Sequence, residues 1–231
     1  MIEIIQNYWL LLLIGQFPTG PLGGLAMTLV LAVCGIGLAF PCSIVIALAL
    51  ISPVTACRKI ALVLVYFVRG LPLLMFIFWA YFGMPALLGT AVPGVVTMLF
   101  ALVIYESVYL AEVIRGGIEA LPKGQTQAAC ALGLTHRQTQ RMIVLPQVLY
   151  NVLPSVLSQF ISTIKETSLG YVISVNEVTF AASQVNSILL TRPFEVYLLL
   201  ALIYFTLCFI LTSCVRVLER WVERSRKPVA G

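Results

Sequence analysis

The chain has 231 residues, of which 61% are hydrophobic and 10% are charged. A soluble domain does not need so much apolar surface, so the composition predicts an all-α integral membrane protein. The net charge of +5 does not indicate a nucleic-acid partner, because the basic residues stand at the ends of apolar runs, a pattern typical of cytoplasmic membrane loops.

The cysteine spacing and the motifs of the sequence argue against several kinds of site. The six cysteines are scattered without a C-x-x-C spacing, so we expect no disulfide framework and no metal site. The sequence also lacks the G-x-x-x-x-G-K-[ST] loop that cradles ATP phosphates. If ATP drives this protein, another chain must bind it.

Residues 1–22 are expected to form an external, interfacial segment. The apolar run at residues 8–14 is too short to cross about 30 Å of hydrocarbon. Only Glu3 carries charge ahead of it, so the run does not have the basic start of a cleaved signal peptide. Tyr8 and Trp9 suit the depth of a membrane surface.

Residues 23–231 are expected to form the membrane domain, beginning with three spans. The first covers about 23–51, with a kink at Pro41. The second covers about 60–82 and contains Arg69, which either has a function or extends back toward the polar end at Arg58. The third covers about 92–114, follows an uncharged external connection at 83–93, and carries Glu106. Near its inner end Glu112 and Arg115, three residues apart, are expected to pair.

The longest polar interval, residues 116–146, is predicted to be a two-helix loop. Residues 125–132 form the first short helix, and Gly133 stands where a left-handed residue ends a helix. Thr135 with Gln138 makes a capping box that opens the second helix, and Pro146 marks the next boundary. Judged on spacing alone, a docking element and an ordinary solvated loop are equally good interpretations.

The segment after Pro146 contains Pro154 and then a polar group at residues 165–168. If a helix starts near Pro154, Lys165 lies about 16 Å along it and close to the membrane midplane. If the helix starts at Pro146, the same residues reach the outer surface. We favour the first interpretation, because helices interrupted by proline expose backbone to substrates.

The last span is expected at about 196–217, followed by a basic tail against anionic lipid. Five spans, with the amino terminus outside and the carboxyl terminus in the cytoplasm, put eleven of the fourteen basic residues inside. These eleven are Arg58, Lys59, Arg115, Lys123, Arg137, Arg141, Arg216, Arg220, Arg224, Arg226 and Lys227.

Three stretches resemble a known family. Gln127-Ala128-Ala129, Gly133 and Leu145-Pro146 match the spacing of the E-A-A loop in membrane permease subunits of ATP-binding-cassette importers. The stretches at 67–74 and 109–118 are similar to those of polar amino-acid permeases. The resemblance implies that this loop packs into a groove of a cytoplasmic ATPase. Gln127 replaces the usual Glu, so a salt bridge there would be lost while a hydrogen bond remains.

A fourth stretch, Lys165-Glu166-Thr167-Ser168-Leu169, resembles the K-D-T-S-L sequence of polar amino-acid permeases, which lies close to the bound amino acid. Glu166 is expected to pair with an α-ammonium or a cationic side chain. Thr167 and Ser168 would add hydroxyl contacts, and Lys165 would neutralise Glu166 in the empty state. Glu106, the deeper carboxylate of the third span, completes the predicted substrate-binding set.

The resemblance therefore implies a permease subunit that forms half of the pathway of an ATP-driven importer for polar amino acids in a bacterial inner membrane. It implies three partners: an ATPase dimer that binds ATP and Mg, a second permease subunit, identical or related, and an external solute-binding protein. The chain itself would bind no cofactor and would not be an enzyme. The alternative is an ATP-independent secondary transporter or channel that uses Glu106, Glu166 or Arg69 for ion coupling.

Overall fold

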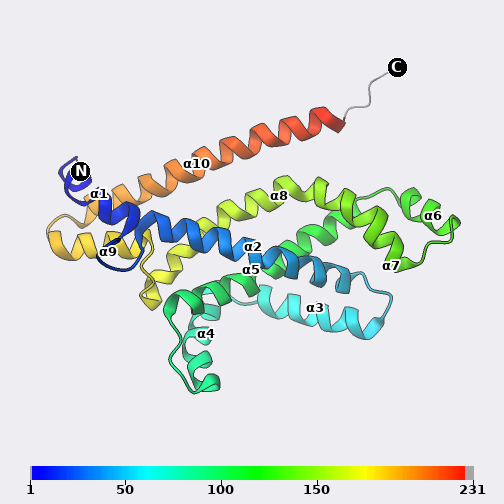
Figure 1. Ribbon diagram of the computed structural model, residues 1–231, viewed down its shortest axis with the longest axis horizontal. Helices are drawn as coiled ribbons and strands as arrows, with labels where there is room; N and C mark the ends of the chain where they lie inside the picture. Colours follow the sequence, from blue (N-terminus) through cyan, green and yellow to red (C-terminus); the bar gives the residue numbers. More distant parts are fainter. Residues whose placement is uncertain (1, 227–231) are drawn as a thin grey trace.

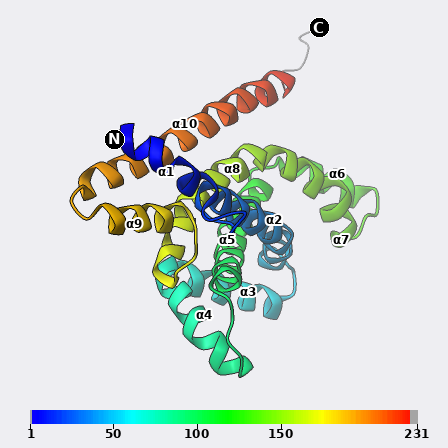
Figure 2. The same ribbon diagram turned by 60° about the vertical axis from the view of Figure 1, so that its left-hand side comes forward.

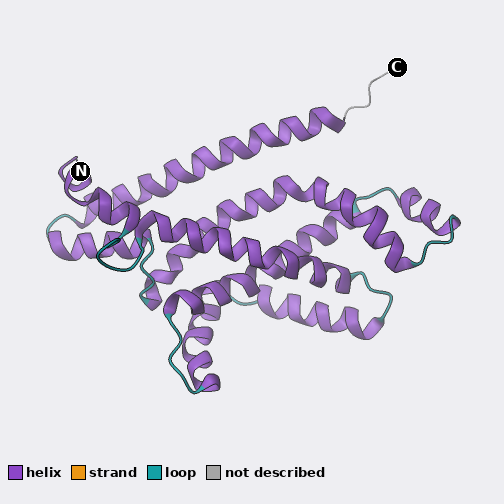
Figure 3. Cartoon of the chain, in the orientation of Figure 1, coloured by secondary structure: helices purple, strands orange, loops and turns teal. Residues whose placement is uncertain are grey.

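The computed structural model describes residues 2–226, with side chains described through Arg220, and Figure 3 shows helices joined by short loops. No strand occurs in the described part of the chain. The elements are α1 (Ile2–Ile14), α2 (Gly24–Leu50), α3 (Thr55–Arg69), α4 (Leu73–Leu88), α5 (Gly94–Glu119), α6 (Lys123–Ala131), α7 (His136–Thr139), the π-helical η1 (Gln140–Val144), α8 (Leu145–Glu166), the 3₁₀ segment η2 (Thr167–Ile173), α9 (Val178–Leu189) and α10 (Pro193–Arg226).

Helices α2 and α5 form the centre of the bundle and run side by side, with α8 packed against both (Figure 1). Small residues allow the close approach: buried Ala39 of α2 meets α5, where the Ser107 hydroxyl donates to the Ala39 carbonyl at 3.3 Å. Between membrane helices, such small residues and hydroxyl groups replace the hydrophobic driving force that water provides elsewhere. The predicted first and third spans are therefore the central pair of the fold.

The predicted second span is not one continuous helix. It is divided into α3 and α4, which meet at an angle of 101°. Pro72 explains the break, because a proline disfavours helical backbone in the residue before it. Figure 2 shows α4 projecting away from the central helices. Helix α4 continues to Leu88, so the expected loop at 83–93 is helical over its first half.

Helix α8 runs without interruption from Leu145 to Glu166, so the expected helix start near Pro154 is wrong, and Pro146 is not a break. The boundary predicted at Pro146 lies one residue after the start of α8, but α7 and the π-helical η1 lead into that helix without a loop. Pro154 lies inside the helix between Val152 and Val156, which are both buried in the core against α2 and α5. This packing holds the helix together across the proline.

Helices α1 and α9 pack together at the far end of the bundle beside the start of α10. The Glu3 carboxylate pairs with the Arg192 guanidinium at 2.9 Å and raises the pKa of Arg192. Helix α1, with 13 residues, is shorter than a membrane span, as predicted for the amino-terminal segment. Its position at a membrane surface stays a prediction.

Four described helices or helical runs are long and apolar enough to cross a membrane, and the bent α3–α4 pair raises the number to five. The start of α3, the α6–α7 loop and the end of α10, which carry most of the basic residues, gather at one end of the molecule (Figure 1). This grouping agrees with the expected orientation, which stays a prediction. Lys227 and the side chains of Arg224 and Arg226 lie outside the described residues.

The contact between α5 and α8 gives a stability prediction. A methyl group added at Gly117 would lie 2.5 Å from Val152 Cγ1 and 3.0 Å from Val148 Cγ1, whereas Gly116 faces open space. We expect Gly117→Ala to cost about 1–3 kcal/mol through overpacking and to lower the melting temperature of the purified protein in detergent. The control, Gly116→Ala, should be neutral or stabilising by about 0.5–1 kcal/mol. Equal melting shifts for both variants would contradict this packing.

Candidate functional site

The α6–α7 loop extends from one end of the bundle (Figure 1). Helix α6 begins two residues before the predicted start, and Gly133 ends it with φ of 80°, as expected. The Leu134 N–H donates to Ala129 O at 3.1 Å and the Gly133 N–H to Cys130 O at 2.9 Å, which satisfies carbonyls at the helix end. A side chain with a Cβ atom is strained at this positive φ.

The capping box predicted at the start of α7 is confirmed. The Thr135 N–H donates to Gln138 Oε1 at 2.9 Å, and the Gln138 N–H donates to Thr135 Oγ1 at 3.4 Å. These reciprocal bonds fix the direction in which the chain leaves the Gly133 turn.

The outer face of α6 is uncharged over the matched motif. Gln127 and Ala128 are exposed, whereas Ala129 is 4% exposed and packs inward. Leu132, the first large apolar residue after the motif, is 82% exposed, and Pro146 is exposed at the base of the loop with Leu145 half-buried. A small, apolar face with one amide group can approach another protein closely without burying an unpaired charge.

A second group of polar residues lies inside the bundle. Glu106, close to the midpoint of α5, is fully buried. The Thr163 hydroxyl of α8 donates to Glu106 Oε1 at 2.7 Å, and the Gln159 amide of α8 donates to Oε2 at 2.9 Å. Because both carboxylate oxygens have donors, the side chain is held in one orientation and couples α5 to α8.

Glu166, the last residue of α8, interacts directly with the Glu106 carboxyl group. Its Oε2 atom is buried and has no hydrogen-bond partner among the described residues. Two carboxylates this close repel each other unless a proton or another cation lies between or beside them. Glu166 Oε2 is therefore a buried acceptor, available to a proton shared with Glu106 or to a donor from outside the chain.

The other predicted substrate residues take different positions. Thr167 is fully buried, and its hydroxyl donates to Ile164 O at 2.8 Å, so that group is used inside the helix end. Ser168 is half-buried. Lys165 lines a cavity of about 370 Å³ between α8 and α10, with Arg216 and Glu219. No ion pair joins Lys165 to Glu166 in the part of the chain with described side chains, since adjacent helical residues face different directions.

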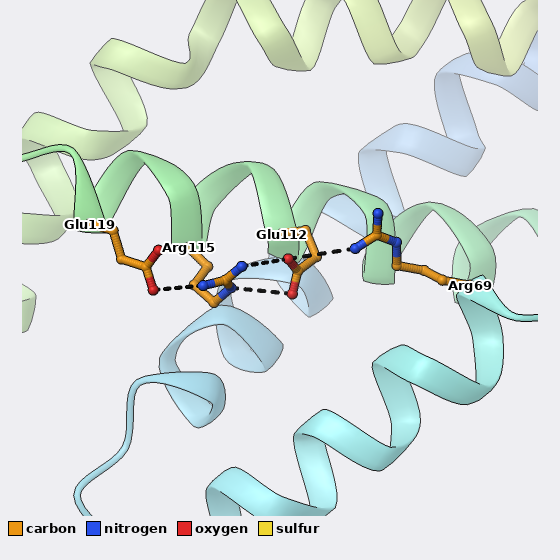
Figure 4. A network of polar contacts seen from close by, with 4 residues as sticks. All are labelled: Arg69, Glu112, Arg115 and Glu119. Carbon is orange, nitrogen blue, oxygen red and sulfur yellow. Dashed lines mark hydrogen bonds and ion pairs between the residues drawn. The ribbon is translucent and has the colours of Figure 1, made fainter.

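A line of ionic contacts runs along the carboxy-terminal half of α5 (Figure 4). Glu112 Oε2 lies 2.8 Å from Arg115 Nη2 and 3.6 Å from Arg69 Nη1, and Arg115 Nη1 lies 2.6 Å from Glu119 Oε1. The predicted pairing of Glu112 with Arg115 is confirmed. The Arg69 contact connects the end of α3 to α5.

Arg69 does not extend back toward Arg58, because its side chain turns to α5 at the opposite end of α3. Its guanidinium lies 5.6 Å from the centre of the Tyr109 ring, within the range of a cation–π contact. The Tyr109 hydroxyl in turn lies 3.1 Å from that of Tyr105, which interacts electrostatically with Glu106 and Glu166. Polar groups thus connect the α3–α4 break to the carboxylate pair.

Comparison with known proteins gives the family. The model of the family "Binding-protein-dependent transport system inner membrane component" matches residues 39–224. The chain belongs to this family. It is 34% identical over 210 residues to the inner membrane amino-acid ABC transporter permease protein YhdY of Escherichia coli (strain K12), covering 89% of this chain and 57% of YhdY. It is 36% identical over 198 residues to the probable glutamine ABC transporter permease protein GlnP of Bacillus subtilis (strain 168), covering 85% of this chain and 90% of GlnP.

Solved structures agree with this family. A crystal structure of an amino acid ABC transporter with histidines superposes with a TM-score of 0.78 at 33% identity, covering 85% of this chain and 91% of that chain. The MetNI methionine ABC transporter shares the fold, with a TM-score of 0.63 at 19% identity. The chain is a multi-pass inner-membrane permease subunit, a transport component and not an enzyme.

One polar cluster of this permease subunit was missed by the sequence analysis. Glu177 is fully buried, and its carboxylate accepts from the backbone N–H groups of Thr179 and Phe180 at 2.8 and 2.9 Å at the start of α9. Tyr204 of α10 donates to the same carboxylate at 3.2 Å. A polar residue directly before an apolar run is a signal for a helix cap, but Glu is not among the commonest capping residues.

Proposed function

We propose that this permease subunit forms half of the translocation pathway of an ATP-driven importer for polar amino acids, and that Glu166 binds the ammonium group of the substrate. The observation that carries the proposal is the buried, unpartnered Oε2 of Glu166 beside the Glu106 carboxylate. An ammonium group supplies both the donor and the positive charge that this pair lacks. Such a charge-assisted bond is strengthened in a poorly hydrated site.

The depth of Glu166 supports this role. Glu106 lies near the midpoint of the α5 span, so the carboxylate that meets it lies near the middle of the bundle as well. Transporters commonly bind their substrates at that depth. The sequence predicted a midplane position for these residues from a helix start near Pro154, but α8 starts at Leu145. The contact between Glu166 and Glu106 of α5 supports the midplane position instead.

Arg69 would serve the carboxylate of the same amino acid. Its side chain is 47% exposed, lies over the Tyr109 ring and makes a long ion pair of 3.6 Å to Glu112. The guanidinium and the carboxylate pair stand at opposite ends of the Tyr109–Tyr105 contact, so the site would offer a positive and a negative group to the substrate. Ser168 would add a hydroxyl contact, whereas Thr167 and Lys165 would hold the end of α8 rather than touch substrate.

The α6–α7 loop would dock on an ATPase subunit that binds ATP and Mg. The exposed Gln127 and Ala128, with Ala129 beneath them and the Gly133 turn, would face the ATPase groove, with Leu145 and Pro146 at the base of the contact. Because five spans enclose only half of a pathway, the importer would need a second permease subunit, identical or related. An external solute-binding protein would deliver the amino acid.

A second candidate function rests on the same carboxylate pair. Glu106 and Glu166 could bind a coupling ion in a secondary transporter or channel that needs no ATPase. The two functions differ in one respect that can be measured, since only the importer requires ATP hydrolysis for uptake.

The substrate role of Glu166 gives a binding prediction. Replacing one charged acceptor with a neutral amide, Glu166→Gln, should weaken amino-acid binding to the purified transporter about 10- to 100-fold, the loss typical of a charge-assisted hydrogen bond. Binding is measured by calorimetry in detergent across a panel of polar amino acids. The control, Glu219→Gln, lies in the α8–α10 cavity and should leave affinity unchanged. Unchanged affinity in a folded, assembled Glu166→Gln variant would contradict the assignment.

The docking role of the loop gives a coupling prediction. Gly133→Val forces a β-branched residue to a positive φ, while no atom stands within 4 Å of the added Cβ, so the effect is confined to the turn. Substrate-stimulated ATP hydrolysis should fall at least about tenfold, since a small misplacement of a coupling element is costly. Membrane insertion should persist.

Gly124→Val is the matched control, because Gly124 also faces open space but has an ordinary helical backbone. It should retain stimulated hydrolysis. Normal stimulation in the Gly133→Val variant would defeat the docking assignment.

A further inference from the structure

A separate cavity of about 530 Å³ lies where the end of α2 and the α2–α3 turn face α7, η1 and the first residue of α8. One wall is apolar and includes Leu48, Ile51 and Leu145. Arg137 and Arg141 of α7 and η1 also line the cavity, and both are exposed and without an ion-pair partner among the described side chains. The cavity is thus amphipathic and positively charged.

Its surroundings strengthen the positive charge. Arg58 and Lys59 stand in the first turns of the adjacent α3. No acidic side chain lines the cavity in the part of the chain that the structure describes. Two unpaired guanidinium groups beside an apolar wall need a ligand that combines an anion with hydrocarbon, because water would solvate the cations and leave the wall exposed.

We propose that this cavity binds an anionic phospholipid of the inner leaflet, with phosphatidylglycerol as the fitting headgroup. The phosphodiester pairs with Arg137 and Arg141, and the first part of an acyl chain covers Leu48, Ile51 and Leu145, which stand at the ends of membrane helices. Gln140 lines the same cavity, and its buried side-chain oxygen has no partner among the described residues. A glycerol hydroxyl of the headgroup supplies the missing donor.

A lipid fits this cavity better than the ATPase does. Of the residues assigned to the ATPase contact, only Leu145, at the base of the loop, lines the cavity. Helix α6, which carries the exposed docking face, contributes none of the lining residues. Basic pockets between membrane helices on the cytoplasmic side are a recurring form of anionic-lipid site. The bound lipid would brace α7 against α2 and so hold the coupling loop at a fixed angle to α8.

The test measures lipid binding to the purified, delipidated transporter in detergent by native mass spectrometry and thermal shift. The probes are phosphatidylglycerol, phosphatidylcholine and glycerol 3-phosphate. Phosphatidylglycerol should bind and raise the melting temperature, and the Arg137→Gln/Arg141→Gln double variant should bind it roughly 10- to 30-fold more weakly. Ile51→Trp, which fills the cavity without removing charge, should weaken binding as well and covers the case in which the double variant fails to fold.

Lys123→Gln, at an exposed lysine of α6 that does not line the cavity, is the control and should bind phosphatidylglycerol like the parent protein. Equal binding of phosphatidylcholine, or equal losses in the control and the double variant, would overturn the proposal in favour of general surface attraction. Equally tight binding of glycerol 3-phosphate would reassign the cavity to a soluble phosphate ester. Loss of the ATPase instead of lipid from the double variant would reassign it to that subunit.

Discussion

The arrangement of this permease subunit depends on one buried carboxylate. Glu106 lies at the centre of α5, and its two oxygens take hydrogen bonds from Thr163 and Gln159 of α8. Burying such a group without partners would cost several kcal/mol, roughly the free energy of unfolding of a whole domain. Helix α8 must therefore pack with Gln159 and Thr163 facing Glu106. The same packing brings Glu166 against Glu106 and sets the start of η2.

Helix α8 links the two proposed sites. It follows α7 through the π-helical η1 and ends at Glu166, so the docking loop and the carboxylate pair stand at the two ends of one nearly continuous helical run. A π-helical turn inside a helix is often found where a helix is adjusted for function. A displacement of α7 by an ATPase would reach Glu166 without passing through a flexible linker, and the second permease subunit would receive the matching motion.

Local features of this fold could be predicted from the sequence. The span at 23–51, the Gly133 turn, the Thr135–Gln138 capping box and the Glu112–Arg115 pair all depend on residues within a few positions of one another, and each is present. The division of the second span at Pro72 was missed because the apolar run continues on both sides of it. Pro154 was misjudged because tertiary packing kept its helix intact.

The long-range contacts of the site could not be derived in this way. Glu106 was selected for its depth, but its bonds to α8 cross more than fifty residues of sequence. The turn of Arg69 toward Glu112 likewise depends on how helices pack and not on spacing. The family resemblance predicted that residues 165–169 contact the substrate, whereas only the fold distinguishes Glu166 from its neighbours in that stretch.

The most direct test of the account is gentle purification of the chain from its native membrane, followed by uptake of labelled amino acids into vesicles with ATP or a non-hydrolysable analogue. The account predicts that an ATPase subunit stays bound and that uptake occurs only with hydrolysable ATP. A chain that purifies alone and moves amino acids equally well without ATP would contradict the importer and assign Glu106 and Glu166 to ion coupling.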